Sequence, residues 1–392
     1  MFKICIYHKT LHMIPYYILR LAPFSSLFYL WCRVCGVFFC EMGSKVETSS
    51  ATTGATPESI AFPASLISHP RLTPIIQTDI SNTRLQIGDQ LRERWVIKGL
   101  IGNGGYGEIY YAIDTTNGEP VAAKVEPVKR RGKVVRRMIL EQKVLLRLQG
   151  QPHVPLMWGS GVERTINYIV MQVLSTNLNE LRKQCPLKRL SRSTSGRVMQ
   201  QAIAGLRDLH NFGYLHRDIK PANMCFGLTE KSMRRLFIVD YGLVRRFRRD
   251  DGQRIPQRTR VGFRGTMRYV SMRVHDRKEQ GPSDDMIALF FCLLEALKGE
   301  LPWKYINSDT KMKAMKMEMV TDDFAKVSQN FGKELGDFGR TVMNMSAEDE
   351  PNYRDLQLIM KRMCGGRHLN EPYDWENDYV EVFTDILSNI DS

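Results

Sequence analysis

The sequence predicts an α+β fold of two lobes, in which a β-rich lobe is followed by a mainly helical one. Strand-like segments at 95–101 and 108–113 flank a glycine-rich stretch. Farther along, apolar residues recur at helical spacing over 194–212, and residues 286–297 are apolar nearly all round, as in a buried helix. With 392 residues, of which 43% are hydrophobic and 25% charged, the chain is long enough to bury a sizeable core.

The first 41 residues are hydrophobic and leave three interpretations open. Residues 21–40 are apolar apart from Arg33, and this length just spans a bilayer. An arginine at the centre of a helix costs about 2.5–3.5 kcal/mol on insertion scales, which weakens a membrane anchor without excluding it. A cleavable signal peptide is another interpretation. We rank first a natural translation start at Met42, with residues 1–41 rarely or never made, and the membrane anchor second.

Eight cysteines in 392 residues do not make a disulfide framework. A zinc site at Cys32, Cys35 and Cys40 ranks last among the interpretations of the first segment, because no second ligand pair follows at a suitable spacing. Four cysteines are scattered through the globular part, which is typical of a reducing compartment: Cys185, Cys225, Cys292 and Cys364. We therefore expect a cytoplasmic protein, with the nucleus as a further location and a membrane-anchored form as the alternative.

Composition divides the rest of the chain into three parts. Residues 42–90 are predicted to be a disordered linker, since 14 of the 46 residues from 43 to 88 are Ser or Thr and no helical or strand period persists. Residues 91–366 form the globular domain. Residues 367–392 form a tail with seven acidic residues and, after Arg367, no lysine or arginine. The tail is a candidate to fold back on a basic segment of the domain.

The glycine-rich stretch lies between two strands, not between a strand and a helix. Gly102, Gly104 and Gly107 form a G-x-G-x-x-G pattern directly after Ile101. This context argues against a dinucleotide-binding fold and favours a hairpin whose backbone approaches the phosphates of ATP. Lys124 follows on a third strand, where its cation can bind two of those phosphates. Taken singly, a hairpin turn and a solvated lysine are the plain alternatives.

A helix is predicted over 134–149, with Met138, Leu145 and Leu148 on its apolar side. Glu141 on this helix is the acid chosen to pair with Lys124. Taken alone, a glutamate on a helix is more often a solvated surface acid.

The loop from His216 to Asn223 carries the strongest chemical signal in the sequence. Asp218 is a candidate base, Lys220 a cation for phosphate charge, and Asn223 an amide ligand for magnesium. Asp240 follows a buried-looking strand, 22 residues after Asp218, and is a second magnesium ligand. Phosphoryl transfer needs these groups together, and their order and spacing disfavour a simple polar turn.

A basic segment follows, where a protein substrate would dock. From Val244 to Arg273 it holds ten arginines against Asp250 and Asp251, and the chain as a whole has a net charge of +14. Arginine suits bidentate binding of phosphate and carboxylate, so we expect acidic or already phosphorylated protein substrates. Nucleic-acid binding is the rival, but the segment has few aromatic platforms for bases, and we expect no nucleic-acid partner.

At this point the sequence resembles a known family. Residues 262–271 read GFRGTMRYVS, and Ser271-Met272-Arg273 stands where most kinases have Ala-Pro-Glu. Together with 163–172, Leu301-Pro302-Trp303 and 372–376 (PYDWE), this segment resembles eukaryotic protein kinases of the casein kinase 1 superfamily, tau-tubulin kinase-like branch. The resemblance covers about 95–376.

The resemblance implies a bilobal protein kinase fold, a kinase domain over 91–366 and transfer of the γ-phosphate of Mg-ATP to Ser or Thr of proteins. The implied catalytic residues are Lys124, Glu141, Asp218 and Lys220, and the implied metal ligands are Asn223 and Asp240. The implied ATP-binding residues are Ile101, Gly102, Gly104, Gly107, Ile109, Ala122, Lys124, Met171, Gln172, Leu174, Cys225 and, as a further wall, Val239. The implied substrate-binding residues are Arg264, Thr266, Arg268 and Arg273.

Departures from the family pattern leave alternatives. Asn307 stands where the family often has a base that binds a substrate phosphate, with Lys304 as a substitute. A pseudokinase scaffold that binds acidic or phosphorylated partners without turnover is the alternative function. We expect a monomer, with a membrane partner only if residues 1–41 are made and inserted.

Overall fold

The computed structural model describes residues 72–80, 82–105, 107–321 and 324–379. The hydrophobic segment 1–41 and the greater part of the predicted linker lie outside the described residues. In the described ranges, no helix combines the length and apolar character needed to cross a membrane.

The first half of the fold is an antiparallel sheet of six strands with one helix against it. The strand order is β1-β2-β3-β4-β8-β7. The bounds are β1 Gln90–Leu91, β2 Trp95–Gly104, β3 Gly107–Asp114, β4 Pro120–Pro127, β7 Met157–Glu163 and β8 Ile166–Gln172. Residues 121–126 of β4 are all buried, because apolar side chains cover both faces of this central strand. Helix α2, Arg137–Leu148, packs against β7 and β8, and a small hairpin, β5 Lys129–Arg130 and β6 Lys133–Val134, precedes it.

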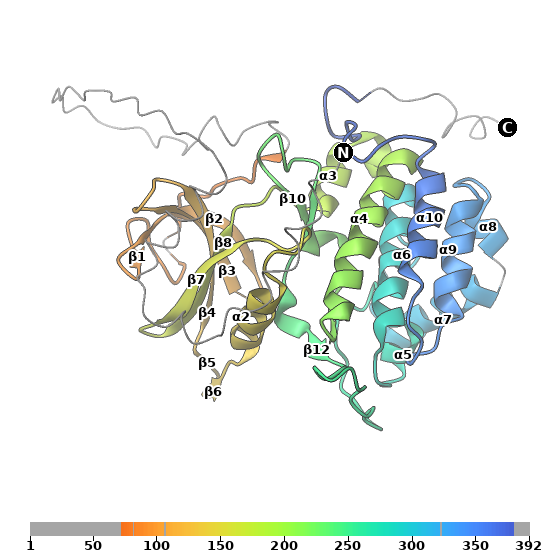
Figure 1. Cartoon of the computed structure of the whole chain (residues 1–392), viewed down its shortest axis with the longest axis horizontal. Helices are drawn as coiled ribbons and strands as arrows, with labels where there is room; N and C mark the ends of the chain where they lie inside the picture. The colour runs from red at the N-terminus through yellow and green to blue at the C-terminus, as the bar shows by residue number, and fades with distance from the viewer. Residues whose placement is uncertain (1–71, 81, 106, 322–323, 380–392) are drawn as a thin grey trace, which may run out of the picture. The chain divides into compact units, whose positions relative to one another are not determined.

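The second half is mainly helical, which confirms the predicted α+β fold. Figure 1 shows α4, α6, α9 and α10 running side by side. The helices are α3 Leu178–Gln184, α4 Arg192–Asn211, α5 Met272–His275, α6 Pro282–Lys298, α7 Asp309–Thr321, α8 Phe324–Ser328, α9 Lys333–Met343 and α10 Tyr353–Met363. Short strands pair as β9 Tyr214–Leu215 with β12 Arg245–Arg246, and as β10 Met224–Phe226 with β11 Leu236–Ile238.

The long helices begin and end close to where the sequence places them. Every residue of α6 from Pro282 to Leu297 is buried, as its all-round apolar pattern predicts. Gly299 ends α6 in the left-handed conformation (φ 87°). Gly281 caps the helix, although Ser283 is the residue in this stretch whose side chain is typical of an N-cap. Pro282 is the first residue of α6, a position that suits proline because its missing N–H would be unpaired there.

The folded part begins before the predicted boundary at residue 91. Leu72 and Ile80 are buried, and Gln77 forms a β-bridge with Leu100, with N···O distances of 2.8 and 2.9 Å between their backbones. The backbone carbonyl of Leu72 also accepts from Thr176. The described residues before 91 are therefore packed on the fold, in contrast to the linker that their Ser/Thr-rich composition predicts.

The beginning of the acidic tail packs on the helical half, and we call residues 371–376 the C-terminal brace. Arg197 of α4 donates hydrogen bonds to the carbonyls of Glu371 (2.5 Å) and Pro372 (2.8 Å) and lies over the ring of Tyr373. Asp374 accepts hydrogen bonds from the backbone N–H and the hydroxyl of Ser191, the residue that caps α4. The brace therefore does not lie on the basic segment, where the tail was predicted to dock. Its aromatic residues pack instead against Phe226 in the core of the helical half. Residues 380–392 lie outside the described residues.

Candidate active site

A buried ion pair joins the sheet to helix α2. Nζ of Lys124, on β4, lies 2.8 Å from both carboxylate oxygens of Glu141. Both side chains are buried, and the apolar side of α2 that carries Met138 and Leu145 turns Glu141 toward β4. Burial opposes the charge on Lys124, but the carboxylates of Glu141 and Asp240 outweigh burial and raise the pKa of the lysine. The predicted pair is thus formed in the structure.

Asp240 joins this pair from the end of β11. Its Oδ1 lies 2.9 Å from Nζ of Lys124, and both of its oxygens lie 3.5 Å from Nη2 of Arg137. The backbone of Asp240 is left-handed (φ 64°), a strained conformation for a residue with a side chain. Burial raises the pKa of its carboxyl, but Lys124 and Arg137 more than reverse this and bring the pKa to about 2. Asp240 is therefore ionised at any physiological pH.

Arg137 is a site residue that the sequence analysis missed. A cation at the first position of a helix is unfavourable beside the helix dipole, and Asp240 offsets this. Gly242, two residues after Asp240, leaves room for the arginine, since a Cβ there would lie 2.2 Å from its Nε. Two features of the sequence could have indicated this contact: a basic residue one helical turn before Glu141, and a glycine two residues after Asp240.

Asp285 of helix α6 holds the backbone of the loop that carries Asp218. Its two carboxylate oxygens accept from the backbone N–H groups of His216 and Arg217, each at 2.8 Å. Nε2 of His210 lies 2.9 Å from Asp285 as well. Asp285 thus accepts hydrogen bonds from the backbone of the loop, as an acid in the first turn of a buried helix can. Arg217 has a left-handed backbone (φ 66°), which these bonds help to hold.

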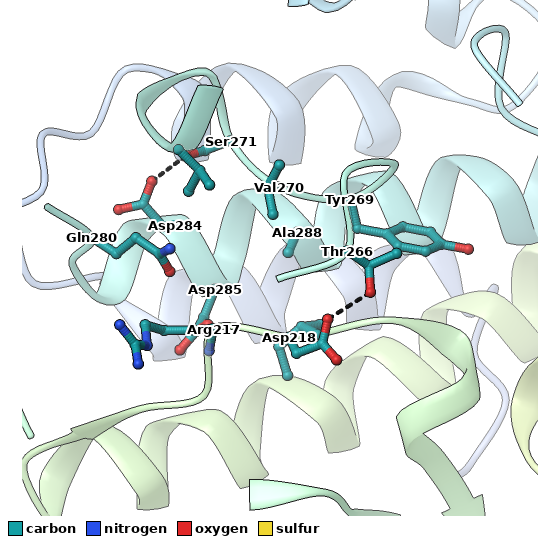
Figure 2. A pocket seen from close by; sticks show the side chains of 12 residues that line it. Arg217, Asp218, Thr266, Tyr269, Val270, Ser271, Gln280, Asp284, Asp285 and Ala288 are labelled. Carbon is teal, nitrogen blue, oxygen red and sulfur yellow. Dashed lines mark hydrogen bonds between the residues drawn. The ribbon is translucent and has the colours of Figure 1, made fainter. Parts of the chain in front are cut away.

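Asp218 is buried, and its carboxylate is hydrogen-bonded to two groups that the sequence predicted for the site. Its Oδ1 accepts from the hydroxyl of Thr266 (2.7 Å), and its Oδ2 accepts from Nζ of Lys220 (2.7 Å). Figure 2 shows Asp218 and Thr266 pointing toward one another from separate segments of the chain. The carboxylate is thus placed between a cation and a hydroxyl.

The orientation of Asn223 suits a metal ligand. Its Nδ2 donates to the backbone carbonyl of Asp218 at 2.9 Å, which leaves the oxygen Oδ1 as a ligand. Within the described ranges, no cluster of three or more His, Cys, Asp or Glu side chains could hold a metal ion by itself. Asn223 and Asp240 are the predicted magnesium ligands, and two such donors would leave the other positions around the ion to phosphate oxygens and water.

The residues predicted to surround adenine come together through the strand register. Ala122 faces Met171 across β4 and β8, Ile109 faces Lys124 across β3 and β4, and Gly102 faces Ile109 across β2 and β3. The same register places the pair Gly104 and Gly107 at the end of the β2–β3 hairpin, and Ile101 directly precedes Gly102 on β2.

The segment after β8 completes this side of the site. The backbone N–H of Gln172 already donates to Leu156 (2.8 Å), but in the described structure neither backbone group of Leu174 is hydrogen-bonded to protein. A free donor and acceptor on one residue suit the edge of a purine. Next along the chain, Ser175 bonds to Phe226, the residue after Cys225, so that β10 is tied to this segment.

The four predicted substrate-binding residues have different environments. Thr266 contacts Asp218, Arg264 is exposed, and Arg268 is half-buried with one bond to the carbonyl of Lys304 (3.3 Å). Arg273 is placed differently from the prediction, since its guanidinium bonds the carboxylate of Asp284 (3.0 Å), the hydroxyl of Ser283 and the carbonyl of Met345. It holds α5 against α6 and does not face the site.

Acidic side chains neutralise part of the basic segment. Glu279 is buried and pairs with Arg258 (2.7 Å) and Arg245 (3.2 Å), a contact that the sequence analysis also missed. In the part of the chain that the structure describes, no acidic partner is found for three exposed arginines of the segment: Arg249, Arg260 and Arg264.

Comparison with known proteins gives one consistent result. Residues 95–361 match the family described as protein kinase domain. A Caenorhabditis elegans protein named as a casein kinase I is 41% identical over 294 residues, which cover 74% of this chain and 86% of that protein. A Dictyostelium discoideum protein named as a serine/threonine-protein kinase is 34% identical over 299 residues, covering 76% of this chain and 59% of that protein. The Caenorhabditis elegans serine/threonine-protein kinase spe-6 is 30% identical over 296 residues, which cover 73% of this chain and 76% of that protein.

Proposed function

The chain belongs to the protein kinase family and is a protein serine/threonine kinase, and we propose that it transfers the γ-phosphate of Mg-ATP through the residues around Asp218. The observation that carries the proposal is the pair of contacts on the Asp218 carboxylate, from Lys220 and from Thr266. These contacts place a base, a cation and a hydroxyl-binding group within hydrogen-bond distance of one another, as in-line phosphoryl transfer requires.

Each residue has a role in this mechanism. Asp218 accepts the proton of the substrate hydroxyl as the oxygen attacks, and Thr266 orients that hydroxyl. Lys220 offsets charge on the transferred phosphoryl group, and Lys124, fixed by Glu141, holds the two inner phosphates. Asn223 and Asp240 would hold magnesium, which when bound neutralises charge on the phosphate oxygens. The glycines of the β2–β3 hairpin let its backbone approach the phosphates.

The proposed substrates are acidic or already phosphorylated proteins. The exposed Arg249, Arg260 and Arg264 support this, because none of them has an acidic partner among the described residues, although Arg264 donates to the carbonyl of Phe263. Membership of the tau-tubulin kinase-like branch, a cytoplasmic location and a monomeric state belong to the same proposal, and they rest on the sequence patterns given above. A pseudokinase scaffold is disfavoured by the complete set Lys124, Glu141, Asp218, Asn223 and Asp240.

A transfer assay with matched variants tests the proposal. The full chain is incubated with labelled Mg-ATP and three peptides of equal length, in which the target serine is flanked by glutamate, by phosphoserine or by lysine. Asp240→Asn removes a metal ligand and should lower transfer by at least about 100-fold. Glu119→Gln, an exposed acid of the β3–β4 turn, is the control and should transfer normally.

The outcomes separate the alternatives. Transfer that is lost in Asp240→Asn and is fastest with the glutamate or phosphoserine peptide supports the proposal. ATP binding without transfer in the unaltered chain would replace it with the scaffold. Fastest transfer to the lysine peptide would keep the kinase and overturn the substrate class.

A further inference from the structure

Lys316 of helix α7 is a buried cation outside the site described above. Its side chain is entirely inaccessible to solvent, and among the described residues it forms no ion pair with a carboxylate. A lysine is almost never fully buried unless its ammonium group is compensated, because burial disfavours the charged form. The contacts of its Nζ atom therefore indicate the role of this lysine in the structure.

The three hydrogens of the Lys316 ammonium group have three acceptors. Nζ lies 2.9 Å from the carbonyl oxygen of Met267, 2.7 Å from that of Val270 and 3.2 Å from Nε2 of His275. Since Nδ1 of His275 is hydrogen-bonded to the carboxylate of Asp309, the other ring nitrogen is the one that accepts. Every donor of the lysine is thus used, and two of them bind the backbone of one short segment.

Aromatic faces complete the environment of the cation. Nζ lies 4.9 Å from the ring centre of Phe291 and 5.5 Å from that of Trp303. Such cation–π contacts are strongest where water is excluded. Burial lowers the pKa of Lys316 to about 7, a shift that the carboxylate of Asp309 opposes.

The segment that Lys316 binds also contacts the proposed base, Asp218. Residues 266–270, which we call the substrate segment, begin at Thr266, whose hydroxyl bonds the Asp218 carboxylate. Trp303 donates its indole N–H to the carbonyl of Arg268 at 2.8 Å. The carbonyls of residues 267, 268 and 270 are therefore all held by side chains from beyond residue 300, which fixes the backbone on which Thr266 and Arg268 stand.

We propose that Lys316 is a positioning residue for the protein substrate: through the carbonyls of Met267 and Val270 it holds the substrate segment where Thr266 meets Asp218. The inference rests on the proposed function and deepens it, since it assigns to α7 a part in substrate binding. Lys316 itself touches neither ATP nor the reacting hydroxyl. It acts on the step in which the peptide binds and is oriented, and it leaves the Lys124–Glu141–Asp240 cluster unchanged.

The test separates peptide binding from ATP binding. Lys316→Met keeps the length of the side chain and removes all three donors. Lys313→Met is the matched control, since Lys313 lies on the same helix and is partly exposed in an ion pair with Asp276. The full chain and both variants are compared for ATP affinity, for peptide KM and kcat, and for direct binding of the preferred peptide by fluorescence anisotropy.

The expected result is selective. In Lys316→Met, the peptide KM should rise and kcat/KM for the peptide should fall by about 10- to 100-fold, because small displacements of positioning groups have effects of this size. The Kd for ATP should stay within about twofold of the unaltered chain, and Lys313→Met should match the unaltered chain throughout. A peptide KM that does not change in Lys316→Met, or an ATP Kd that weakens in parallel with it, would overturn the inference.

Two further arms make every outcome informative. If Lys316→Met does not bind ATP because it fails to fold, Trp303→Phe decides, since it removes only the donor to Arg268 within the same segment. A normal peptide KM in Trp303→Phe would then count against the inference. If the unaltered chain transfers no phosphate, the proposed function fails by itself, while anisotropy still shows whether Lys316→Met weakens binding of the peptide.

Discussion

Trp375→Ala tests whether the C-terminal brace is part of the folded catalytic domain, although residue 375 lies beyond the region that matches the family. The Trp375 side chain is fully buried, with its ring centre 5.2 Å from that of Phe226 and 4.7 Å from that of Tyr373. Truncation of a buried tryptophan to alanine costs about 3–5 kcal/mol, through lost transfer energy and the cavity that remains. Whole domains are stable by only about 5–15 kcal/mol, so this is a large fraction of the total.

The expected loss can be read as a melting temperature. At about 2 °C per kcal/mol for a large domain, Trp375→Ala should lower the Tm by about 6–10 °C, followed by circular dichroism on the full chain. Because Phe226 follows the predicted adenine-pocket residue Cys225 on β10, affinity for ATP should fall as well. Trp158→Ala is the control, since Trp158 is 50% exposed and its loss should change stability by no more than about 0.5 kcal/mol. Equal Tm values for the two variants would refute the reasoning.

Three more predictions follow from the buried charges. Asp285→Asn weakens the hydrogen bonds that Asp285 accepts from the catalytic-loop backbone. Since a bond to a charged group contributes about 1.5–3 kcal/mol, the substitution should lower kcat/KM by about 10- to 150-fold. An unchanged kcat/KM would show that the loop keeps its conformation without Asp285. Lys124→Met leaves the Glu141 carboxylate buried without its cation, so urea denaturation should show a loss of about 3–5 kcal/mol, against none for the exposed Lys143→Met. The folded pKa of Asp240, about 2, is below its ordinary value of 3.8, so its contribution to stability is complete above about pH 4 and is lost as the pH falls toward 2. The stability difference between the unaltered chain and Asp240→Asn should therefore shrink over that range, by at most about 1.4 kcal/mol per pH unit, and a constant difference would contradict the assignment.

Local patterns in the sequence were enough to predict the elements whose contacts follow from their own periodicity. The all-round apolar run of α6 could only be a buried helix, and an acid in its first turn suits the N–H groups of a neighbouring loop, as Asp285 shows. The pairing of Lys124 with Glu141 follows from the general pattern of phosphoryl-transfer sites, in which an acid orients the phosphate-binding lysine, and not from periodicity.

Contacts between distant segments could not be predicted in this way. The sequence shows that Arg273 is a cation, but its partner Asp284 is fixed by the packing of α5 on α6. Leu72 and Ile80 lie in a stretch rich in Ser and Thr that has no period, so nothing local indicates their burial. Lys316 lies within a run of methionine and charged residues, a pattern typical of an amphipathic surface helix. Its burial depends on carbonyls 46 and 49 residues earlier in the chain.

The bridge between Gln77 and Leu100 has a practical consequence for handling this protein. It covers part of the outer rim of β2, beyond the two residues that pair with β1. A fragment that begins at residue 91, where composition suggests the boundary, would lose Gln77 and Gln90 of β1, and would leave N–H and C=O groups along β2 open to another chain. Exposed edge strands of this kind pair with the same strand of another molecule. Such a fragment should therefore self-associate, whereas one that begins ahead of Leu72 should remain monodisperse.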